Sequence, residues 1–501
     1  MIQYILGLLQ AIISGSMSYV TAKYFLMVLL AVIIYYILPL KTRWVVLLIG
    51  SGYFFWELTN SIKEPAVFLF SIITSHVAGL LIYKYKKSSP SCISKLLLFI
   101  GILASTGPLV FSKFGRLLSN SINRIPAVDW IIPIGLSFYS MMIISYLVDV
   151  YNGKYAPQKN IFKFALYLSF FPIIIQGPIS RYDQLGDELY EGHRYDYNNI
   201  LSGLELVLWG FFLKYLIADK SAIIVNAVFD NHQAYSGLYV LVAAILYSIQ
   251  LYTDFLSCVT ISRGVAQLFG ITLINNFNHP YFSTSVKDFW RRWHISLSTW
   301  LRDYIYIPLG GNRNGKVRKY INLAITFAIS GIWHGESYKY LFWGLLHSFY
   351  QITGDIIAKP KDFLLGKMAL PKGSAARKVF ESIVTFILVM IGWIVFRADS
   401  LKIGIQMIIS MFSCYNPWIF FDDSLYRLGL GQKEFNILLL SILILFIVSF
   451  LQEKGIRIRA WINRQNLLIR WGIYLLAIWS IWIFGTYGSG FNAADFIYGG
   501  F

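Results

Sequence analysis

The sequence predicts an all-α polytopic membrane protein, on the evidence of its composition and its long apolar runs. Hydrophobic residues make up 57% of the 501 residues, aromatic residues 17% and charged residues only 14%, against roughly 25% charged in ordinary globular chains. A soluble protein of this size could not bury so much apolar surface. Soluble, disordered and fibrous classes are therefore excluded.

Apolar runs follow one another along the whole chain at lengths that suit membrane helices. A transmembrane helix needs about 20 apolar residues, and several runs are shorter, so we expect about 11 to 13 transmembrane or re-entrant helices. The candidate spans are 23–39, 43–58, 66–83, 95–112, 128–150, 160–176, 200–217, 237–256, 320–335, 340–357, 379–396, 434–451 and 471–488. The sequence shows no internal repeat, and we expect a single integral membrane domain over residues 1–501.

Basic residues outnumber acidic residues by 43 to 25 and gather in clusters between the apolar runs. In a membrane protein such clusters hold loops on the cytoplasmic side, so we interpret the charge in this way and not as nucleic-acid binding. The clusters lie within 84–87, 313–319, 359–378 and 454–470. With all of them in the cytoplasm, residues 320–357 must cross and return through a turn near 334–339. The tail 489–501 then lies outside.

His334 is the residue that the sequence marks most clearly for acid–base chemistry. It lies in SGIWHGES, at a glycine-flanked break between two apolar runs. An ionisable side chain at membrane depth costs a few kcal/mol and indicates a functional site by default. Histidine is also well matched to proton transfer near neutral pH. The alternative is a core histidine held only by packing.

A second candidate is His294, in the stretch DFWRRWHISLSTWLRDYIYIPLGGNR. As one helix, this stretch would place Trp290 and Trp293 on one side and Arg291 with His294 on another. One interpretation is an interfacial amphipathic helix with an aromatic belt. The other is the wall of a polar cavity that leads to His334.

Other polar residues within or beside apolar runs need partners in the fold. We expect Asp254, in LYTDF, to pair with an arginine or a histidine, and Asp149 and Arg181 to face inward. A structural role is the favoured interpretation for all three, and packing for His347. The candidate tunnel and substrate-binding residues are Asp254, Trp290, Arg291, Trp293, Arg302 and Trp333.

No motif for metal or nucleotide chemistry is present in the sequence. HExxH, Walker A, GxGxxG and GxSxG patterns are all missing, as is any Cys and His cluster at ligand spacing. The three cysteines are far apart and indicate no disulfide framework. We therefore expect acid–base chemistry by histidine, with no metal and no bound cofactor.

Three stretches of the sequence together resemble the membrane-bound O-acyltransferase (MBOAT) family, and most closely its bacterial alginate O-acetyltransferase type. They lie at 133–182, 275–313 and 330–351, and the second contains FWRRWHISLSTWLRDYIYIPLGG. The resemblance is dense over 130–350. It implies helices around a central tunnel, with His334 as the catalytic histidine and His294 as the second histidine. The segment DFLSCVTISRG at 254–264 departs from the family pattern, which loosens any inference about substrate recognition there.

The last residues, AADFIYGGF, resemble an aromatic motif that ends proteins of this group or their small companions. The resemblance implies that Tyr498 carries the acyl group, with Phe496 and Phe501 at matching positions and Gly499 in place of a phenylalanine. A frayed hydrophobic tail is the alternative interpretation.

The sequence as a whole favours a membrane O-acyltransferase of the bacterial plasma membrane. The expected reaction moves an acyl group from a cytoplasmic donor to an extracytoplasmic polysaccharide or cell-wall polymer. Acetyl is the acyl group that we expect. The expected donor is acetyl-CoA or an acyl carrier, and the resemblance implies an extracytoplasmic partner of acetyltransferase or esterase fold. D-alanyl transfer to teichoic acid stays open, as does a transporter of polysaccharide precursors. A scaffold for a secretion complex is the weakest alternative.

Overall fold

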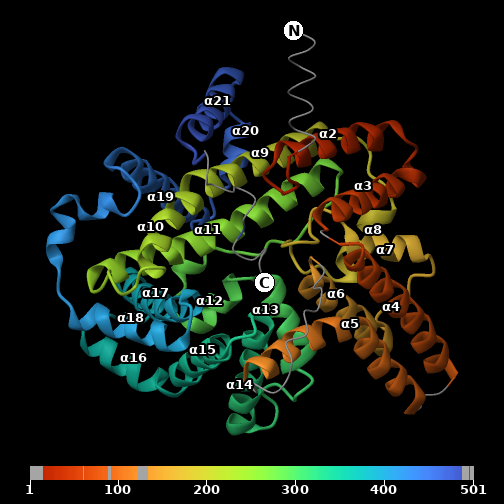
Figure 1. The fold of residues 1–501 in the computed structure, drawn as a ribbon, viewed down its shortest axis with the longest axis horizontal. Coiled ribbons are helices and arrows are strands. Elements are labelled where there is room, and N and C mark those ends of the chain that lie inside the picture. The colour runs from red at the N-terminus through yellow and green to blue at the C-terminus, as the bar shows by residue number, and fades with distance from the viewer. Residues whose placement is uncertain (1–14, 60, 89–91, 122–133, 488–495, 497–501) are drawn as a thin grey trace. The chain divides into compact units, whose positions relative to one another are not determined.

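The computed structural model describes residues 15–59, 61–88, 92–121, 134–487 and 496. Over these residues the chain is helical and contains no strand (Figure 1), so the predicted all-α class is confirmed. The chain divides into two compact units. Unit 1 comprises Met1–Phe211, Ser257–Ile274 and Ser489–Phe501, and unit 2 comprises Phe212–Leu256 and Asn275–Gly488. The expectation of a single domain over 1–501 stays a prediction.

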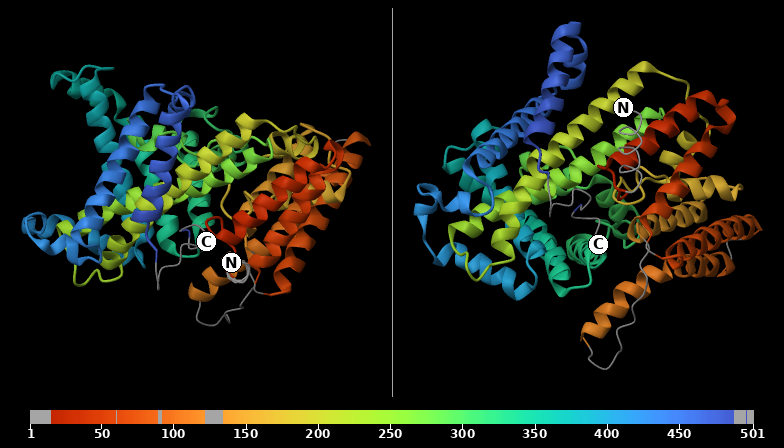
Figure 2. Two further views of the ribbon diagram at one scale, coloured as in Figure 1. Left: turned by 90° about the horizontal axis from the view of Figure 1, so that it is seen from above. Right: turned by 45° about the horizontal axis from the view of Figure 1, so that its top comes forward.

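Unit 1 is built mainly from the helices that precede residue 212. They are α2 (Ala22–Ile37), α3 (Arg43–Leu58), α4 (Lys63–Ser88), α5 (Cys92–Ser121), α6 (Leu136–Asn152), α7 (Ile161–Ser169), α8 (Tyr182–Tyr190) and α9 (Tyr197–Phe212). Helices α4 and α5 pack side by side, as the views in Figure 2 show. Polar caps start several of these helices; the side chain of Asn160, for example, accepts hydrogen bonds from the first amides of α7.

The apolar run 160–176 gives a shorter helix than a membrane span needs. Helix α7 ends at Ser169, and Pro172 follows shortly after it. Proline lacks an amide hydrogen and disfavours helix in the residue before it, so the helix cannot continue. The irregular backbone that follows is buried but bonded, since Phe171 N donates to Ser51 Oγ at 3.1 Å.

Unit 2 begins in the long helical stretch that α9 opens, and it ends with the last helix of the chain. Its helices are η2 (Leu213–Ala218), α10 (Asp219–Phe229), α12 (Val286–Arg292), α13 (Ile295–Leu301), η4 (Arg302–Tyr306), α14 (Gly315–His334), α15 (Tyr338–Ile356), α16 (Ala358–Lys367), α17 (Ala375–Arg397), α18 (Leu401–Ser413), α19 (Gln432–Glu453), α20 (Ile458–Asn463) and α21 (Leu467–Phe484). The long helix α11 (Leu238–Leu268) contributes residues to both units.

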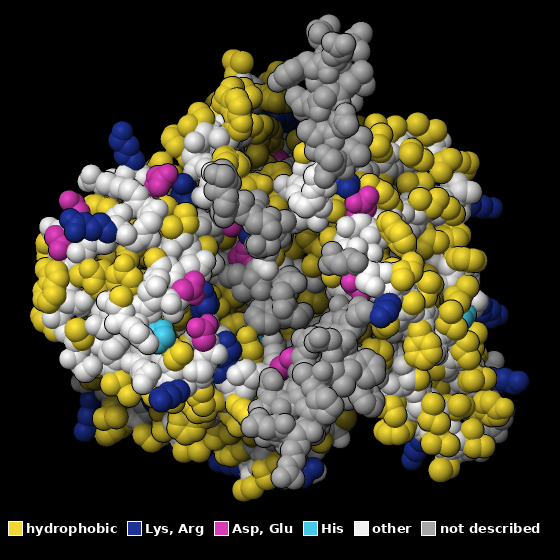
Figure 3. Space-filling view, viewed as in Figure 1, with side chains coloured by type: hydrophobic (Ala, Val, Ile, Leu, Met, Phe, Trp, Pro, Cys, Tyr) yellow, Lys and Arg dark blue, Asp and Glu magenta, His cyan; other side chains and the backbone are white. Residues whose placement is uncertain are grey.

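Seven helices among the described residues are long and apolar enough to cross a membrane. They are Lys63–Lys86, Cys92–Leu109, Tyr197–Phe229, Leu238–Leu268, Ala375–Arg397, Gln432–Glu453 and Leu467–Phe484. Hydrophobic side chains cover much of the face drawn in Figure 3. Only 6% of the last of these helices is buried inside the protein, which suits contact with lipid. The predicted multi-pass membrane architecture is confirmed.

The basic stretch 359–378, expected as a loop, begins with a helix instead. Helix α16 leads into α17 through a corner rich in ion pairs. Glu381 of α17 lies 2.9 Å from Lys361 Nζ and 3.1 Å from Arg377 Nε. These pairs partly neutralise the positive charge, so helix can form in a stretch whose composition alone indicated a solvated loop.

Candidate active site

His334 is the last residue of α14, at the tip of a helical hairpin that α14 makes with α15. Glycines bring the two helices into close contact. A Cβ atom at Gly331 would lie 2.2 Å from the Tyr340 carbonyl oxygen, and one at Gly344 would lie 2.2 Å from the Phe327 carbonyl oxygen. Only glycine fits at either position. The predicted turn near 334–339 is therefore confirmed.

The imidazole of His334 is 2% exposed and lies in an aromatic cage. The ring centroids of Trp333, Trp343 and Phe396 lie 4.8, 5.1 and 5.5 Å from the imidazole centroid. Trp343 and Phe396 meet the imidazole at 90° and 80°, the edge-to-face arrangement that aromatic rings prefer. The cage fixes the plane of the imidazole and keeps bulk water away from it.

Lys339 holds the start of α15 against the end of α17. Its Nζ donates to the Ala398 carbonyl oxygen at 2.6 Å and lies 4.8 Å from the Tyr340 ring centroid. A lysine that caps the C-terminal end of a helix also interacts favourably with the helix dipole. Because α17 carries Phe396, this contact keeps one wall of the His334 cage in place.

The stretch around His294 is not one helix, so that prediction is wrong. Helix α12 ends at Arg292, α13 begins at Ile295, and His294 between them is left-handed with φ 44° and ψ 56°. Ile295 N donates to the Asn276 carbonyl oxygen at 2.9 Å, and Asn278 N donates to the Arg292 carbonyl oxygen at 2.9 Å. These long-range hydrogen bonds override the helical periodicity that the sequence displays.

His294 and His334 share Trp333 as a neighbour. His294 is 1% exposed, and its ring lies 6.3 Å from Trp333 and 4.7 Å from Phe255. Its Nδ1 lies 3.5 Å from Ser296 Oγ, whereas its Nε2 has no hydrogen-bond partner among the described residues. The structure thus brings together His294, Trp333 and His334, the three residues predicted to line a common site.

The predicted residues Trp290 and Trp293 lie in a buried aromatic core next to that site. Trp290 Nε1 donates to His347 Nδ1 at 3.2 Å, and His347 is fully buried. Trp293 is 1% exposed and stacks on Phe289 with the ring centroids 5.3 Å apart. Their contacts fit a packing role, which is also the role interpreted for His347.

Arg291 and Arg302 were predicted to accompany His294, but both are exposed whereas His294 is buried. The side chain of Arg302 is 58% exposed and lies 2.7 Å from that of its neighbour Asp303. The break at His294 explains this difference, because a continuous helix would have carried the arginines along the same face as the histidine.

Asp254 pairs with a lysine, so the predicted arginine or histidine partner is wrong. Lys214 Nζ lies 2.8 Å from Asp254 Oδ1 and 3.0 Å from Asp219 Oδ1. All three side chains are at most 6% exposed. Lys214 belongs to η2, a π-helical segment of the kind that often marks functional positions. The sequence offered one signal that was missed, since Lys214 and Asp219 interrupt an apolar run.

The other inward-facing carboxylate, Asp149 of unit 1, is buried as predicted, with 9% of its side chain exposed. Its Oδ2 lies 3.4 Å from Lys154 Nζ at the end of α6. Arg181 is half-buried at the start of α8. These residues support the ends of helices in unit 1, which fits the structural interpretation.

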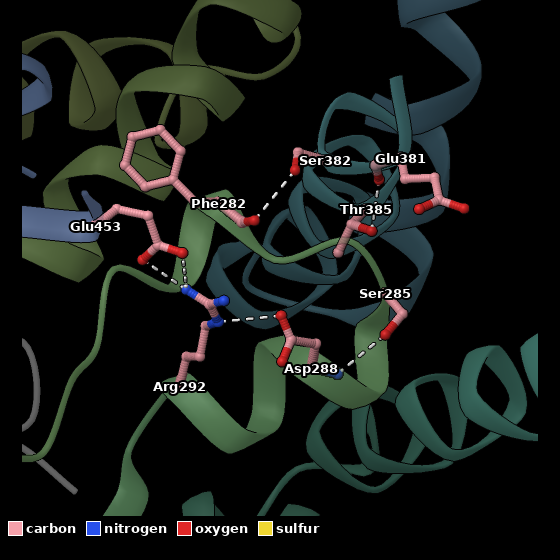
Figure 4. A network of polar contacts seen from close by, with 8 residues as sticks. All are labelled: Phe282, Ser285, Asp288, Arg292, Glu381, Ser382, Thr385 and Glu453. Atoms are coloured by element: carbon pink, nitrogen blue, oxygen red, sulfur yellow. Dashed lines mark hydrogen bonds and ion pairs between the residues drawn. The ribbon is translucent and has the colours of Figure 1, made fainter. Parts of the chain in front are cut away.

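Arg292 fixes the end of α12 just before the His294 turn. Its Nη1 lies 2.9 and 2.8 Å from the two carboxylate oxygens of Glu453, and its Nε donates to Asp288 at 3.0 Å (Figure 4). Nearby, Ser382 Oγ donates to the Phe282 carbonyl oxygen at 3.1 Å (Figure 4). These contacts join α12 and the segment before it to α19 and α17. Partners so far apart in sequence could not be read from the local pattern.

Tyr498 lies outside the described residues, so its predicted role stays a prediction. Phe496 is described; it is 7% exposed and lies 6.5 Å from the Tyr19 ring within unit 1. Among the described residues, no group of three or more His, Cys, Asp or Glu side chains could hold a metal ion.

The fold and the site define a class: a multi-pass membrane protein in which two buried histidines both have the Trp333 ring as a neighbour. The profile of the MBOAT, membrane-bound O-acyltransferase family, matches residues 127–360, which include both histidines. The chain is 35% identical to a probable alginate O-acetylase of Pseudomonas aeruginosa, over 70% of this chain and 66% of that protein. It is 30% identical to a peptidoglycan O-acetyltransferase of Helicobacter pylori, over 74% and 73% respectively.

A third relative is a teichoic acid D-alanyltransferase of Bacillus subtilis, 29% identical over 54% of this chain and 70% of that protein. The chain belongs to the membrane-bound O-acyltransferase family. With bacterial relatives and its apolar helices, it is a multi-pass bacterial membrane protein. The match spans 66%, 61% and 65% of three alginate O-acetylase relatives, which is less than two thirds of their length.

Proposed function

We propose that the chain is an O-acyltransferase that moves an acetyl group from a cytoplasmic donor to an extracytoplasmic polysaccharide or cell-wall polymer. The observation that carries the proposal is His334, buried at the tip of the α14–α15 hairpin, with the Trp333 ring as a neighbour of both His334 and His294. The relatives named for acetylation of alginate and of peptidoglycan support acetyl as the acyl group.

His334 serves as the general base in this reaction. One imidazole nitrogen takes the proton from the attacking hydroxyl group as its oxygen bonds to the carbonyl carbon of the acyl thioester. The tetrahedral intermediate then collapses, the carbon–sulfur bond breaks, and the departing thiolate receives the proton back from His334. A positioned histidine of this kind contributes about 10²–10⁴-fold to the rate. His294 orients the donor or supports His334.

Water exclusion matters because a thioester can also be hydrolysed. The rings of Trp343 and Phe396 lie against the buried imidazole. A base without access to bulk water activates the bound acceptor hydroxyl and not a water molecule. The donor is acetyl-CoA or an acyl carrier, and either supplies the thioester that the reaction consumes.

Tyr498 is the proposed acceptor of the first transfer. An oxygen ester of tyrosine can form from a thioester without new energy input, and it holds the acyl group ready for a second transfer outside the membrane. An extracytoplasmic partner of acetyltransferase or esterase fold then moves the group to the polymer.

The test compares His334→Ala with His232→Ala, which changes a half-buried histidine outside the cage. Ester-linked acetate is released by mild base from the envelope polymers of cells that carry each variant, and it is counted per mole of folded chain. We expect His334→Ala to abolish the chain-dependent acetate and His232→Ala to leave it unchanged. Full acetylation by His334→Ala, with ester-linked alanine also unchanged, would contradict the proposal and would favour the transporter alternative.

D-alanyl transfer is the second candidate, because one relative is named a teichoic acid D-alanyltransferase. The same base treatment releases alanine from such esters, so a single experiment separates the two acyl groups. Loss of ester-linked alanine in His334→Ala cells, with acetate unchanged, would identify alanyl and not acetyl as the transferred group. The proposed role of His334 as general base would stand.

A further inference from the structure

One residue, Asn276, holds the backbone on which His294 sits. Its carbonyl oxygen accepts from Ile295 N at 2.9 Å, and its side-chain Oδ1 accepts from Ser296 N at 2.9 Å. These are the first two amides of α13, which no earlier turn of the same helix can satisfy. Asn276 is 2% exposed, so water does not replace these bonds.

His294 cannot cap α13 itself. It is the N-cap residue by position, but its side chain makes no capping hydrogen bond. Its φ of 44° places it in the left-handed region, which a non-glycine residue keeps only where the surrounding structure enforces it. The hydrogen bonds that Ile295 N and Ser296 N donate to Asn276 supply that enforcement, because Asn276 belongs to a segment that lies earlier in the chain.

A second contact confirms that the two segments run side by side. Asn278 N donates to the Arg292 carbonyl oxygen at 2.9 Å. Here only backbone atoms take part, and the Asn278 side chain is exposed. Asn278 is therefore a matched control for Asn276. Both residues are asparagines two positions apart, but only the Asn276 side chain holds the turn.

We infer that Asn276 is the positioning residue of His294. Its Oδ1 fixes the first turn of α13, and this turn fixes the imidazole that lies 6.3 Å from Trp333. The inference rests on the proposed function, in which His294 orients the donor or supports His334. Asn276 acts only through His294.

The test uses Asn276→Ala and Asn278→Ala in cells, with ester-linked acetate and alanine counted per mole of folded chain. Alanine removes the acceptor, and a displaced imidazole lowers the rate on the order of 10- to 100-fold. Asn278→Ala leaves the rate unchanged.

A double variant separates positioning from general support of the fold. If Asn276 acts through His294, Asn276→Ala combined with His294→Ala is no slower than His294→Ala alone. Losses that multiply in the double variant would overturn the inference. Full activity of His294→Ala would instead refute the role of His294 in the proposed function. A slow His294→Ala beside a fully active Asn276→Ala would refute only the inference about Asn276.

Discussion

Trp333 is a ring neighbour of both candidate histidines. Its ring lies 4.8 Å from that of His334 and 6.3 Å from that of His294. Unlike the two histidines, Trp333 is only half-buried. The indole therefore stands at the edge of the cage, where it is the partly exposed member beside two buried imidazoles.

A second residue-scale feature is the buried charge cluster of Lys214, Asp219 and Asp254. One lysine serves two carboxylates at 3.0 and 2.8 Å. Burial makes such a cluster sensitive to the loss of any member, because the charges left behind have neither water nor a partner. The cluster also lies close to the site along the chain, since Phe255 follows Asp254 and contacts His294.

Replacing Lys214 measures how much this cluster contributes to the free energy of unfolding. We expect Lys214→Met to lower the free energy of unfolding by about 3–5 kcal/mol, because two buried carboxylates lose their counter-charge. Arg302→Met, which breaks the exposed pair with Asp303, should cost less than about 1 kcal/mol. Thermal unfolding in detergent measures both variants, and equal melting temperatures would contradict this account of the cluster.

At the scale of elements, the α14–α15 hairpin places the candidate base. Its tip holds His334, and the glycines of its interface set how closely the helices pack. Its open end is tied by Lys319 Nζ, which lies 2.7 Å from Asp355 Oδ2. The hairpin is therefore fixed at both ends, and the imidazole depends on the packing between them.

A glycine substitution tests that dependence. Gly331→Leu would force its Cβ against the Tyr340 carbonyl oxygen, only 2.2 Å away, so we expect α14 to shift and the acyl ester yield to fall on the order of 100-fold. Gly354→Ala on α15 is the matched control, because nothing lies within 4 Å of its added Cβ. Alanine there favours the helix by about 1 kcal/mol. A fully active Gly331→Leu would show that the hairpin does not set the site.

The elements also show which parts of the site could be predicted from the sequence. The hairpin turn could, because basic clusters and flanking glycines are local signals. The break at His294 could not, because it depends on hydrogen bonds that α13 amides donate to Asn276, which lies before α12. The partner of Asp254 was missed for a similar reason, since Lys214 lies 40 residues earlier on another helix.

At the scale of the whole molecule, the candidate site belongs to a single unit. His294, Trp333, His334 and Asn276 all lie in unit 2, within Phe212–Leu256 and Asn275–Gly488. The apolar composition that excluded a soluble protein reappears as helices with lipid-suited surfaces. The tail Ser489–Phe501, which contains Tyr498, is assigned to unit 1.

Mass spectrometry of the C-terminal peptide tests this account most directly. The chain is purified from cells as the wild type, as His334→Ala and as Tyr498→Phe, and the peptide that contains position 498 is sequenced in each. The account predicts an acetyl group on Tyr498 in the wild type and none in either variant. Acetyl-Tyr498 at the wild-type level in His334→Ala would contradict the role of His334, and an unmodified Tyr498 in the wild type would contradict the relay.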